Sequence, residues 1–290
     1  MRDSFNSNTI LTGLIGHPIK QSFSPFIQNV AFELKNMDYL YLPFDIPPAN
    51  LKNALSGSVA LGIRGFNVTI PHKEKIIEFI DTLSEEAAMI GAVNTVVNDH
   101  GKLIGYNTDV TGVIESLMPF KDEIAGSIVS VVGAGGGARA VIYALIRHFK
   151  PMEINLINRT EERALALLNY FSTKMKYDSF KNYERFPPDN VNILKNSKLV
   201  INTTSVGMFP DVNDTITELE ESFNSKQIVF DIIYNPPDSK LLKIAARSGA
   251  TVFGGVRMFI QQAAKSFELW TGEKMPVEEV TKSLELYMAK

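Results

Sequence analysis

The fold of this chain is decided by one stretch of sequence, Ile128-Val129-Ser130-Val131-Val132-Gly133-Ala134-Gly135-Gly136-Gly137-Ala138-Arg139. Its opening run is short and mostly β-branched, which predicts a strand that is buried on both faces. Gly133 then allows a tight turn, Gly135 lets the backbone approach a pyrophosphate, and Ala138 fills the third position of the pattern Gly-x-Gly-x-x-Gly/Ala. The helix predicted over about 138–149 would point its free N–H groups at the phosphates. We therefore expect a dinucleotide to contact the whole loop, namely Gly133, Ala134, Gly135, Gly136, Gly137 and Ala138.

The second strand of this unit carries the signal for the type of dinucleotide. It is predicted over 153–158, one helix after the glycine loop, as a βαβ unit requires. An NAD-binding unit normally has Asp or Glu at the end of this strand to hold the ribose 2′-hydroxyl. This chain instead has Asn158, Arg159 and Thr160, followed by Arg163. A guanidinium can bind a 2′-phosphate through two parallel hydrogen bonds, which predicts NADP(H). The alternative is that both arginines are ordinary solvated residues at a helix start.

Length and composition indicate a two-domain enzyme. The chain has 290 residues, of which 45% are hydrophobic and 21% charged, and its formal net charge is −3. That charge favours no broad basic face for nucleic acid. The chain has no cysteine, and its four histidines are scattered, so we expect no metal site and a reducing, cytoplasmic environment. The first residues lack the apolar core of a signal peptide, and no apolar run is long enough to span a membrane.

The chain before the glycine loop alternates strands and helices and is predicted to form its own α/β domain. Strands are predicted over 10–16, 38–44 and 62–69, and a hairpin over 92–106. The two last helices, over about 256–270 and 276–288, follow no further strand, so we expect them to pack back on the first domain. The predicted domains are residues 1–109 with 256–290, and 110–255. No element is predicted over 172–192.

Two charged residues of the first domain stand at the ends of predicted strands. Lys73 follows the strand over 62–69 and is placed in the first turn of a helix; the carboxyl edge of a parallel sheet is where ligands bind. A lysine there can transfer protons, although on position alone a solvated surface lysine is the more common case. Asp109 follows Asn107 and Thr108 just before another helix, where an ordinary N-cap is the more common role.

Several motifs in this order resemble the shikimate dehydrogenase family over nearly the whole chain, least over 172–192 and at the two ends. The family patterns are G-x-P-I-x-x-S-x-S-P, N-V-T-x-P-x-K, G-A-x-N-T and G-x-N-T-D. The matching segments are Gly16-His17-Pro18-Ile19-Lys20-Gln21-Ser22-Phe23-Ser24-Pro25, Asn67-Val68-Thr69-Ile70-Pro71-His72-Lys73, Gly91-Ala92-Val93-Asn94-Thr95 and Gly105-Tyr106-Asn107-Thr108-Asp109. In the second half, Asn158-Arg159-Thr160 and Asn202-Thr203-Thr204-Ser205-Val206-Gly207-Met208 are similar to the NADP-type members.

The resemblance implies the reversible, NADPH-dependent reduction of 3-dehydroshikimate to shikimate in aromatic amino-acid biosynthesis. Lys73 would then donate the proton, and Asp109 would hold Lys73 and the hydroxyl that is made or oxidised. The implied substrate contacts are Ser22 and Ser24 for the carboxylate, at a helix start predicted with Ser24 as N-cap, and Thr69, Asn94, Gln262 and Tyr234 for the hydroxyls. Further implied cofactor contacts are Thr203, Thr204, Gly255 and Met258.

One residue departs from the family pattern, and two other functions remain open. Gln28-Asn29 stands where the family often has a His-Asn pair, on the face of a helix that is expected to point into the structure. The first alternative is a quinate/shikimate dehydrogenase that uses NAD; Arg159 and Arg163 argue against an NAD preference. The second is a catalytically silent ligand-binding relative, and retention of both Lys73 and Asp109 argues against it. Monomer and homodimer are both compatible with the sequence.

Overall fold

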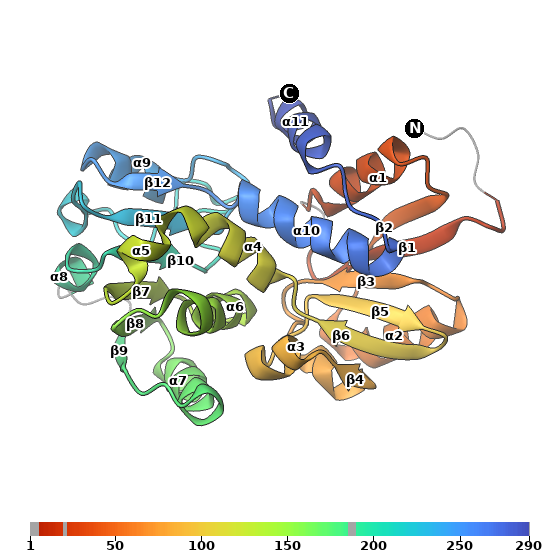
Figure 1. The fold of residues 1–290 in the computed structure, drawn as a ribbon, viewed down its shortest axis with the longest axis horizontal. Coiled ribbons are helices and arrows are strands. Elements are labelled where there is room, and N and C mark those ends of the chain that lie inside the picture. Colours follow the sequence, from red (N-terminus) through yellow and green to blue (C-terminus); the bar gives the residue numbers. More distant parts are fainter. Residues whose placement is uncertain (1–5, 20–21, 185–189, 290) are drawn as a thin grey trace. The chain divides into compact units, whose positions relative to one another are not determined.

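The computed structural model describes residues 6–19, 22–184 and 190–289 (Figure 1). It divides into two compact units, Met1–Gly112 with Ile260–Lys290, and Val113–Phe259. The chain passes from one unit to the other within helices α4 (Asp109–Leu117) and α10 (Val256–Thr271). The predicted domain boundaries, at 109/110 and 255/256, lie at the starts of these two helices. The C-terminal helices therefore return to the first unit, where α11 (Val277–Met288) lies beside α1 (Ser24–Leu34) (Figure 1).

The first unit is built on a mixed sheet in the order β2-β1-β3-β5-β6-β4. Strand β1 is parallel to β2 and β3, whereas β5 is antiparallel to both β3 and β6. Its strands are β1 (Ile10–Gly16), β2 (Tyr39–Asp45), β3 (Gly65–Val68), β4 (Thr82–Leu83), β5 (Thr95–Asp99) and β6 (Lys102–Tyr106). Its other helical segments are η1 (Pro48–Asn50), α2 (Leu51–Ala60), η2 (Lys75–Phe79) and α3 (Glu85–Ile90). As a result, β3 and β6 end, and β5 begins, at the same edge of the sheet.

The segment after β3 differs from its prediction. Lys73 lies in a turn, and the helix expected to begin there is the short 3₁₀ helix η2, two residues later. The backbone N–H of Ile77 bonds to the carbonyl of Glu74, three residues back, and Ile80 already has extended backbone. Strand β4 follows almost at once, so the chain has no room for an α-helix. The periodic isoleucines that suggested a helix contribute instead to the core of the first unit, where Ile76 is fully buried.

The core of the first unit includes the chain's single tryptophan. Trp270, on α10, is 1% exposed and its indole Nε1 donates to the Val96 carbonyl at 3.0 Å. Its ring lies 5.9 Å from that of Tyr41. A Cβ at Gly65 would collide with this indole, so β3 needs glycine at that position to accept the tryptophan.

The second unit has the parallel, doubly wound sheet that the glycine loop predicts. The order is β12-β11-β10-β7-β8-β9, and every neighbouring pair is parallel. Counted from β7 this is the order 3-2-1-4-5-6 of a Rossmann fold, in which ligands bind at the carboxyl ends of the strands. The strands are β7 (Ile128–Val132), β8 (Glu153–Asn158), β9 (Phe180–Glu184), β10 (Leu199–Asn202), β11 (Ile228–Asp231) and β12 (Thr251–Phe253). The helical segments are η3 (Met118–Phe120), α5 (Lys121–Ile124), α6 (Gly136–Ala144), η4 (Leu145–Phe149), α7 (Glu161–Met175), α8 (Asn190–Lys195), η5 (Glu220–Ser222) and α9 (Lys240–Arg247).

Two details of this unit differ from the prediction. The helix predicted over 138–149 begins at Gly136, and its last turn, Leu145–Phe149, is a π-helix that ends at Lys150 in the left-handed region. Within 172–192, where no element was predicted, β9 forms the edge of the sheet and α8 begins at Asn190; residues 185–189 lie outside the described part of the chain. As an edge strand, β9 is only partly buried, so its sequence lacks the apolar run of β7.

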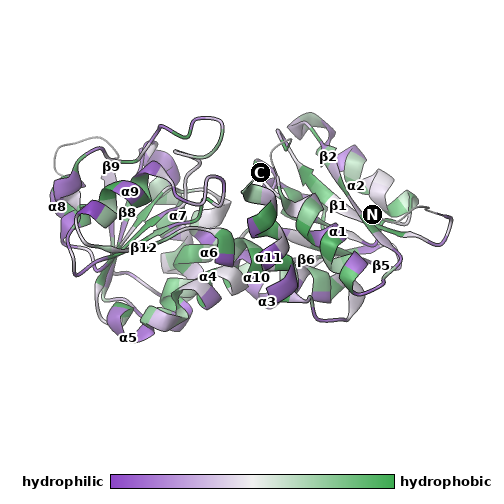
Figure 2. Cartoon of the chain, turned by 90° about the horizontal axis from the view of Figure 1, so that it is seen from above, coloured by the Kyte–Doolittle hydropathy of each residue, from purple (hydrophilic) through white to green (hydrophobic). Residues whose placement is uncertain are grey.

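Hydrophobic residues concentrate in the strands of both sheets (Figure 2). In β7, β8 and β10 nearly every residue is buried, as expected for strands covered on both faces. None of the helices in the described ranges has the length and apolar character needed to cross a lipid bilayer.

A buried carboxyl group joins the ends of β10 and β11. Asp231 is fully buried, and its Oδ2 accepts a hydrogen bond from Ser239 Oγ at 2.6 Å. Its Oδ1 accepts from Asn202 Nδ2 at 3.0 Å and from the backbone N–H of Ile233 at 3.1 Å. Burial raises the pKa of Asp231 to about 6, although these hydrogen bonds act in the opposite direction.

We predict that Asp231→Asn flattens part of the pH dependence of stability. Because the folded-state pKa of Asp231 is raised, its contribution is present below the unfolded-state value and lost as pH rises through about 6. From about pH 5 to about pH 8, wild-type protein should lose on the order of 1 kcal/mol more of unfolding free energy than the variant. Urea unfolding at both pH values measures this. The exposed control Asp211→Asn should follow wild type, and parallel wild-type and Asp231→Asn curves would contradict the prediction.

Candidate active site

Lys73 and Asp109 form a largely buried ion pair at the carboxyl edge of the first sheet. Lys73 Nζ donates to Asp109 Oδ2 at 2.5 Å, and the two side chains are 17% and 8% exposed. Asp109 is the first residue of α4, and the Lys73 carbonyl accepts a hydrogen bond from the Val93 N–H at 2.7 Å. The pair meets because the loops that follow β3 and β6 leave the sheet at the same edge.

Asn94 holds the other oxygen of the carboxylate. Its Nδ2 donates to Asp109 Oδ1 at 2.8 Å, while its Oδ1 accepts from the backbone N–H of Thr108 at 2.6 Å. A backbone N–H can only donate, so this second bond fixes which end of the amide faces Asp109. Asn94 immediately precedes β5, and the antiparallel pairing of β5 with β6 places it beside Asn107 and Thr108.

Helix α10, the first of the two C-terminal helices, brings Gln262 to the same group. Gln262 Oε1 lies 3.4 Å from Asn94 Nδ2, and the side chain is 9% exposed. Residues that are far apart in the sequence, Lys73, Asn94, Asp109 and Gln262, are thus in one connected set of polar contacts. The arrangement presents an ammonium group and a carboxylate side by side, which is suited to moving a proton.

The three other predicted substrate residues of the first unit lie on the loops after β1 and β3. Ser22 Oγ donates to Ser24 Oγ at 3.1 Å and accepts from the backbone N–H of Ser24 at 3.2 Å. The residue at the N-cap position of α1 is Phe23 and not Ser24, because Ser24 is already the first residue of the helix, and the backbone N–H of Ser24 donates to Ser22 Oγ. Thr69 follows β3, and a Cβ at Gly16 would collide with its methyl group, so glycine allows these two loops to touch. Lys20 and Gln21 of the opening motif lie outside the described residues.

Gln28 connects the helix that follows the serine motif to α10. It is fully buried, and its Nε2 donates to the carbonyl of Ala263 at 3.0 Å. Ala263 is the neighbour of Gln262. The departure from the family's usual histidine therefore falls at a helix–helix contact of the first unit.

In the second unit the glycine loop has the geometry that the pattern predicts. Gly133 has φ of +111°, and a Cβ there would come within 2.6 Å of Thr203 Oγ1 and 2.9 Å of Thr204 Cγ2. A Cβ at Gly135 would meet nothing within 4 Å, so this residue faces open space ahead of α6. The first N–H groups of a helix have no partner inside the helix, and α6 begins at the next residue, Gly136.

The loop after β10 packs over the glycine loop. Thr203 donates both its N–H, at 2.8 Å, and its hydroxyl, at 2.7 Å, to the Val132 carbonyl. The hydroxyl of Thr204 donates to Asn202 Oδ1 at 2.7 Å. Both threonine side chains thus shape the loop itself, and the predicted cofactor residues 133–138, Thr203 and Thr204 lie together.

At the end of β8 the predicted 2′-phosphate residues surround one short turn. Asn158 Nδ2 donates to the Thr160 carbonyl at 2.7 Å, which shapes the entry to α7. Arg159 and Arg163 are exposed, and Thr160 is the N-cap residue of α7. Arg159 thus lies in the turn after β8 and Arg163 in the first turn of α7, at the positive end of the helix dipole.

Tyr234, Gly255 and Met258 belong to the second unit. The ring of Tyr234 stacks on Phe259 with centroids 4.1 Å apart. Gly255 donates its N–H to the Ile233 carbonyl at 2.8 Å, and a Cβ there would collide with the Ile232 carbonyl. Met258 is 6% exposed. Glycine at 255 thus lets the start of α10 approach the loop after β11.

The structure also joins polar residues for which the sequence predicted no role, although Asn67, Thr95 and Thr108 belong to the family motifs. Below Asn94 lies a buried network made of Tyr41, Asn67, Thr95, Thr108 and Ser266. One signal was present: Asn67 is a polar residue inside the apolar strand β3, where a buried amide requires partners. The identity of those partners depends on the fold.

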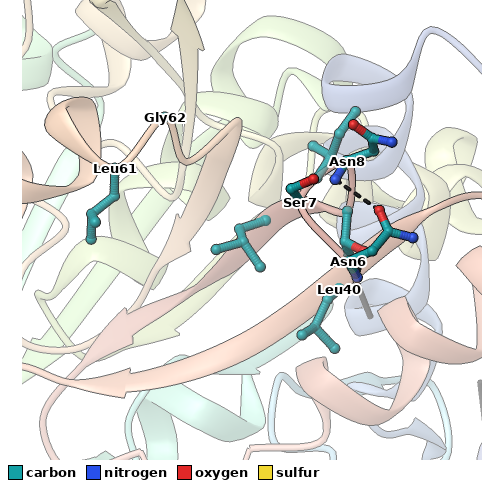
Figure 3. A pocket seen from close by; sticks show the side chains of 9 residues that line it. Asn6, Ser7, Asn8, Leu40, Leu61 and Gly62 are labelled. Atoms are coloured by element: carbon teal, nitrogen blue, oxygen red, sulfur yellow. Dashed lines mark hydrogen bonds between the residues drawn. The ribbon is translucent and has the colours of Figure 1, made fainter. Parts of the chain in front are cut away.

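The described residues show no metal-binding group, and one pocket lies away from the candidate site. Within the described part of the chain, no group of three or more His, Cys, Asp or Glu side chains is arranged to hold a metal ion. A pocket at the opposite end of β1 is lined by residues 6–11, Leu40, Leu61 and Gly62, none of which was predicted to be functional (Figure 3).

Family models match most of the chain in three segments. The model of the shikimate dehydrogenase substrate-binding domain matches residues 14–96, and the model of shikimate/quinate 5-dehydrogenase matches residues 117–241. The model of the shikimate 5′-dehydrogenase C-terminal domain matches residues 255–285.

Individual relatives match over nearly the full length. A shikimate dehydrogenase (NADP(+)) of Caldanaerobacter subterraneus subsp. tengcongensis is 45% identical over 272 residues, which is 92% of this chain and 94% of the relative. A solved shikimate dehydrogenase in complex with NADP+ superposes with a TM-score of 0.90 at 36% identity, over 99% of this chain and 98% of the other. Quinate dehydrogenase from Corynebacterium glutamicum, solved in complex with NAD, has a TM-score of 0.85 at 30% identity, with 96% and 99% coverage. With its substrate-binding sheet, its Rossmann unit and these matches, the chain belongs to the shikimate dehydrogenase family.

Proposed function

We propose that this protein catalyses the reversible, NADPH-dependent reduction of 3-dehydroshikimate to shikimate, a step of aromatic amino-acid biosynthesis. The observation that carries the proposal is the buried Lys73–Asp109 pair, held by Asn94, in a chain of this family. The enzyme is an oxidoreductase that acts on a CH–OH group and uses NADP. We expect it to work in the cytoplasm, as a monomer or a homodimer.

Lys73 and Asp109 are assigned to the proton. NADPH, when bound, supplies the hydride for the carbonyl carbon. Lys73 Nζ donates a proton to the carbonyl oxygen as that oxygen becomes a hydroxyl, and it takes the proton back in the reverse direction. Asp109 accepts a hydrogen bond from Lys73 and so holds its Nζ in position, and Asn94 fixes the carboxylate in place. Since the pair is largely buried, its interaction is stronger than that of an exposed pair would be.

The polar residues of the first unit suit a substrate with one carboxylate and several hydroxyls. Ser22 and Ser24, at the start of α1, are assigned to the carboxylate, since helix N-termini favour anions. Thr69, Asn94 and Gln262 are assigned to hydroxyls, whereas the contribution expected of Tyr234, a residue of the second unit, stays a prediction. Each offers a small neutral donor or acceptor, which fixes orientation without adding charge.

The residues of the second unit fit NADP. Gly135 leaves open space at the start of α6, where a pyrophosphate can accept N–H donors. Arg159 and Arg163 are assigned to the 2′-phosphate, with Asn158 and Thr160 shaping the turn between them. Thr203, Thr204, Gly255 and Met258 complete the proposed cofactor contacts.

One alternative is the NAD-dependent oxidation of quinate, which has a counterpart in the Corynebacterium glutamicum relative. The absence of Asp or Glu among Asn158, Arg159 and Thr160 favours NADP for this chain. A catalytically silent ligand-binding protein is the other alternative, and the intact ion pair disfavours it.

The test of the function is the rate of nicotinamide reduction by purified protein, followed by absorbance, with shikimate or quinate and with NADP⁺ or NAD⁺. We expect fast turnover for shikimate with NADP⁺ alone. Turnover of quinate with NAD⁺ would assign the chain to the quinate branch. Inactivity of folded protein that still binds NADPH would favour the silent relative.

Lys73→Met is expected to lower kcat by about 10²–10⁴-fold with a smaller change in KM for shikimate, because it removes the proton-transferring group at nearly constant side-chain length. Lys75→Met is the matched control, since Lys75 is exposed and its ion pair with Glu78 is also exposed to solvent and therefore contributes little to stability. Steady-state kinetics of both variants measure the effect. A large KM change at intact kcat would reassign Lys73 to substrate binding.

Arg159→Ala is expected to reduce kcat/KM for NADP⁺ about 10–100-fold while leaving the value for NAD⁺ within about threefold, because a charge-assisted hydrogen bond to a phosphate is lost. The control is Arg147→Ala, because Arg147 is an exposed arginine in η4, the turn that directly follows α6. If both cofactors lost efficiency equally, Arg159 would support the loop and not the phosphate.

A further inference from the structure

Beneath the proposed catalytic pair lie three buried hydroxyl groups, those of Thr95, Thr108 and Ser266, which we call the hydroxyl triangle. The oxygen–oxygen distances are 3.1 Å between Thr95 and Thr108, 2.8 Å between Thr95 and Ser266, and 3.1 Å between Thr108 and Ser266. All three residues are at most 2% exposed. They come from the start of β5, the loop before α4 and the middle of α10, so only the folded chain assembles the triangle.

The lower side of the hydroxyl triangle is held by Asn67 on β3. Asn67 Nδ2 donates to Thr95 Oγ1 at 3.0 Å and to Ser266 Oγ at 2.9 Å. The hydroxyl of Tyr41 donates to Asn67 Oδ1 at 2.8 Å, and Asn67 Nδ2 also donates to the backbone carbonyl of Asn94 at 3.3 Å. Because a carbonyl can only accept, this last bond fixes the NH₂ end of the amide toward the triangle. Two of the three hydroxyls therefore receive an amide N–H, and each keeps its one proton for a further acceptor.

The upper side of the hydroxyl triangle meets the candidate active site. Asn94 Oδ1 lies 3.2 Å from the hydroxyl oxygens of both Thr95 and Thr108, each of which can donate its one proton either to this oxygen or within the triangle, and Asn94 Nδ2 lies 3.0 Å from Thr108 Oγ1. Ser266 Oγ donates to the carbonyl of Gln262, one helical turn earlier, at 3.0 Å. The triangle thus touches the amide that holds Asp109 and the turn of α10 that carries Gln262.

We propose that the hydroxyl triangle is a positioning device, which sets the Asn94 amide and the Gln262 turn relative to each other and, through Asn94, the place of Asp109. Thr95, Thr108 and Ser266 act through these neighbours and are positioning residues. The reaction that they serve rests on the proposed function, whereas the positioning itself does not. A buried network in which every member is satisfied is rigid, so loss of one hydroxyl is felt by all of them.

Thr95 offers a sharp pair of variants. Thr95→Val keeps the shape of the side chain and removes the hydroxyl, and Thr95→Ser keeps the hydroxyl and removes the methyl group. Thr12→Val is the matched control, because Thr12 is also a fully buried strand residue of the first unit and its hydroxyl donates to a backbone carbonyl, that of Leu40, at 3.2 Å. Thr12 belongs to β1 and has no contact with the triangle among the described hydrogen bonds.

Thr95→Val is expected to lower kcat/KM for shikimate about 10–100-fold, since a small displacement of orienting groups has effects of this size. KM for NADP⁺ should stay within about twofold, because the proposed cofactor residues lie in the second unit. Thr95→Ser should recover activity to within about threefold of wild type, and Thr12→Val should remain within the same range. Equal damage from Thr95→Val and Thr95→Ser, or from Thr95→Val and Thr12→Val, would overturn the proposal.

Ser266→Ala tests whether the three hydroxyls act as a unit. If they do, the Thr95→Val/Ser266→Ala double variant should be about as active as the worse single variant, and the two losses should not multiply. Multiplying losses would show two independent sites and contradict a shared device.

Hydrogen–deuterium exchange separates this proposal from the proposed function. In Thr95→Val, amides in peptides that cover 107–110 and 260–267 should exchange faster than in wild type, and Thr12→Val should leave these peptides unchanged. Unchanged exchange in Thr95→Val would overturn the positioning role even in an active enzyme. Faster exchange in a protein whose wild type does not turn over shikimate would retain the positioning role and reject the reaction.

Discussion

The structure of the first unit depends on the need to satisfy one buried carboxylate. Asp109 is 6% exposed, and an unpaired charge at such a place would be strongly destabilising. Lys73 takes one oxygen and Asn94 the other, so the carboxylate is compensated by one charge and one amide. Asn94 in turn needs the Thr108 N–H, and through the buried hydroxyls the requirement extends to β3 and α10. The mixed sheet, with β5 running against its neighbours, is what delivers these loops to one edge.

We propose that the two units recognise their ligands by different chemistry. In the second unit the recognition rests mainly on the backbone. Glycine at 133 and 255 lets loops and a helix start come close to each other, and glycine at 135 leaves open space before α6. In the first unit the recognition rests on side chains, namely neutral hydroxyls and amides around a single ion pair. A phosphate chain is recognised well by N–H groups, whereas a ring with several hydroxyls needs separately placed partners.

Local patterns in the sequence predicted the fold of the second unit well, because a glycine loop, a buried strand and the arginines after β8 are all encoded within about forty residues. Edge strand β9 was missed because half-buried polar strands lack an apolar signature. The helix predicted at Lys73 was wrong, since Ile76 and Ile77 fit a 3₁₀ turn equally well. Family motifs indicated Asn94 and Gln262, but the partnership of Asn67 with Ser266 spans 199 positions and only tertiary packing reveals it.

The buried tryptophan makes half of this molecule optically visible. Trp270 is the chain's only indole, and it sits in the core of the first unit against Tyr41 and the Val96 carbonyl. The second unit, Val113–Phe259, contains no tryptophan at all. Intrinsic indole fluorescence therefore reports on the environment of the first unit only, while circular dichroism averages over both. Comparing the two signals separates the melting of one unit from that of the other without any label.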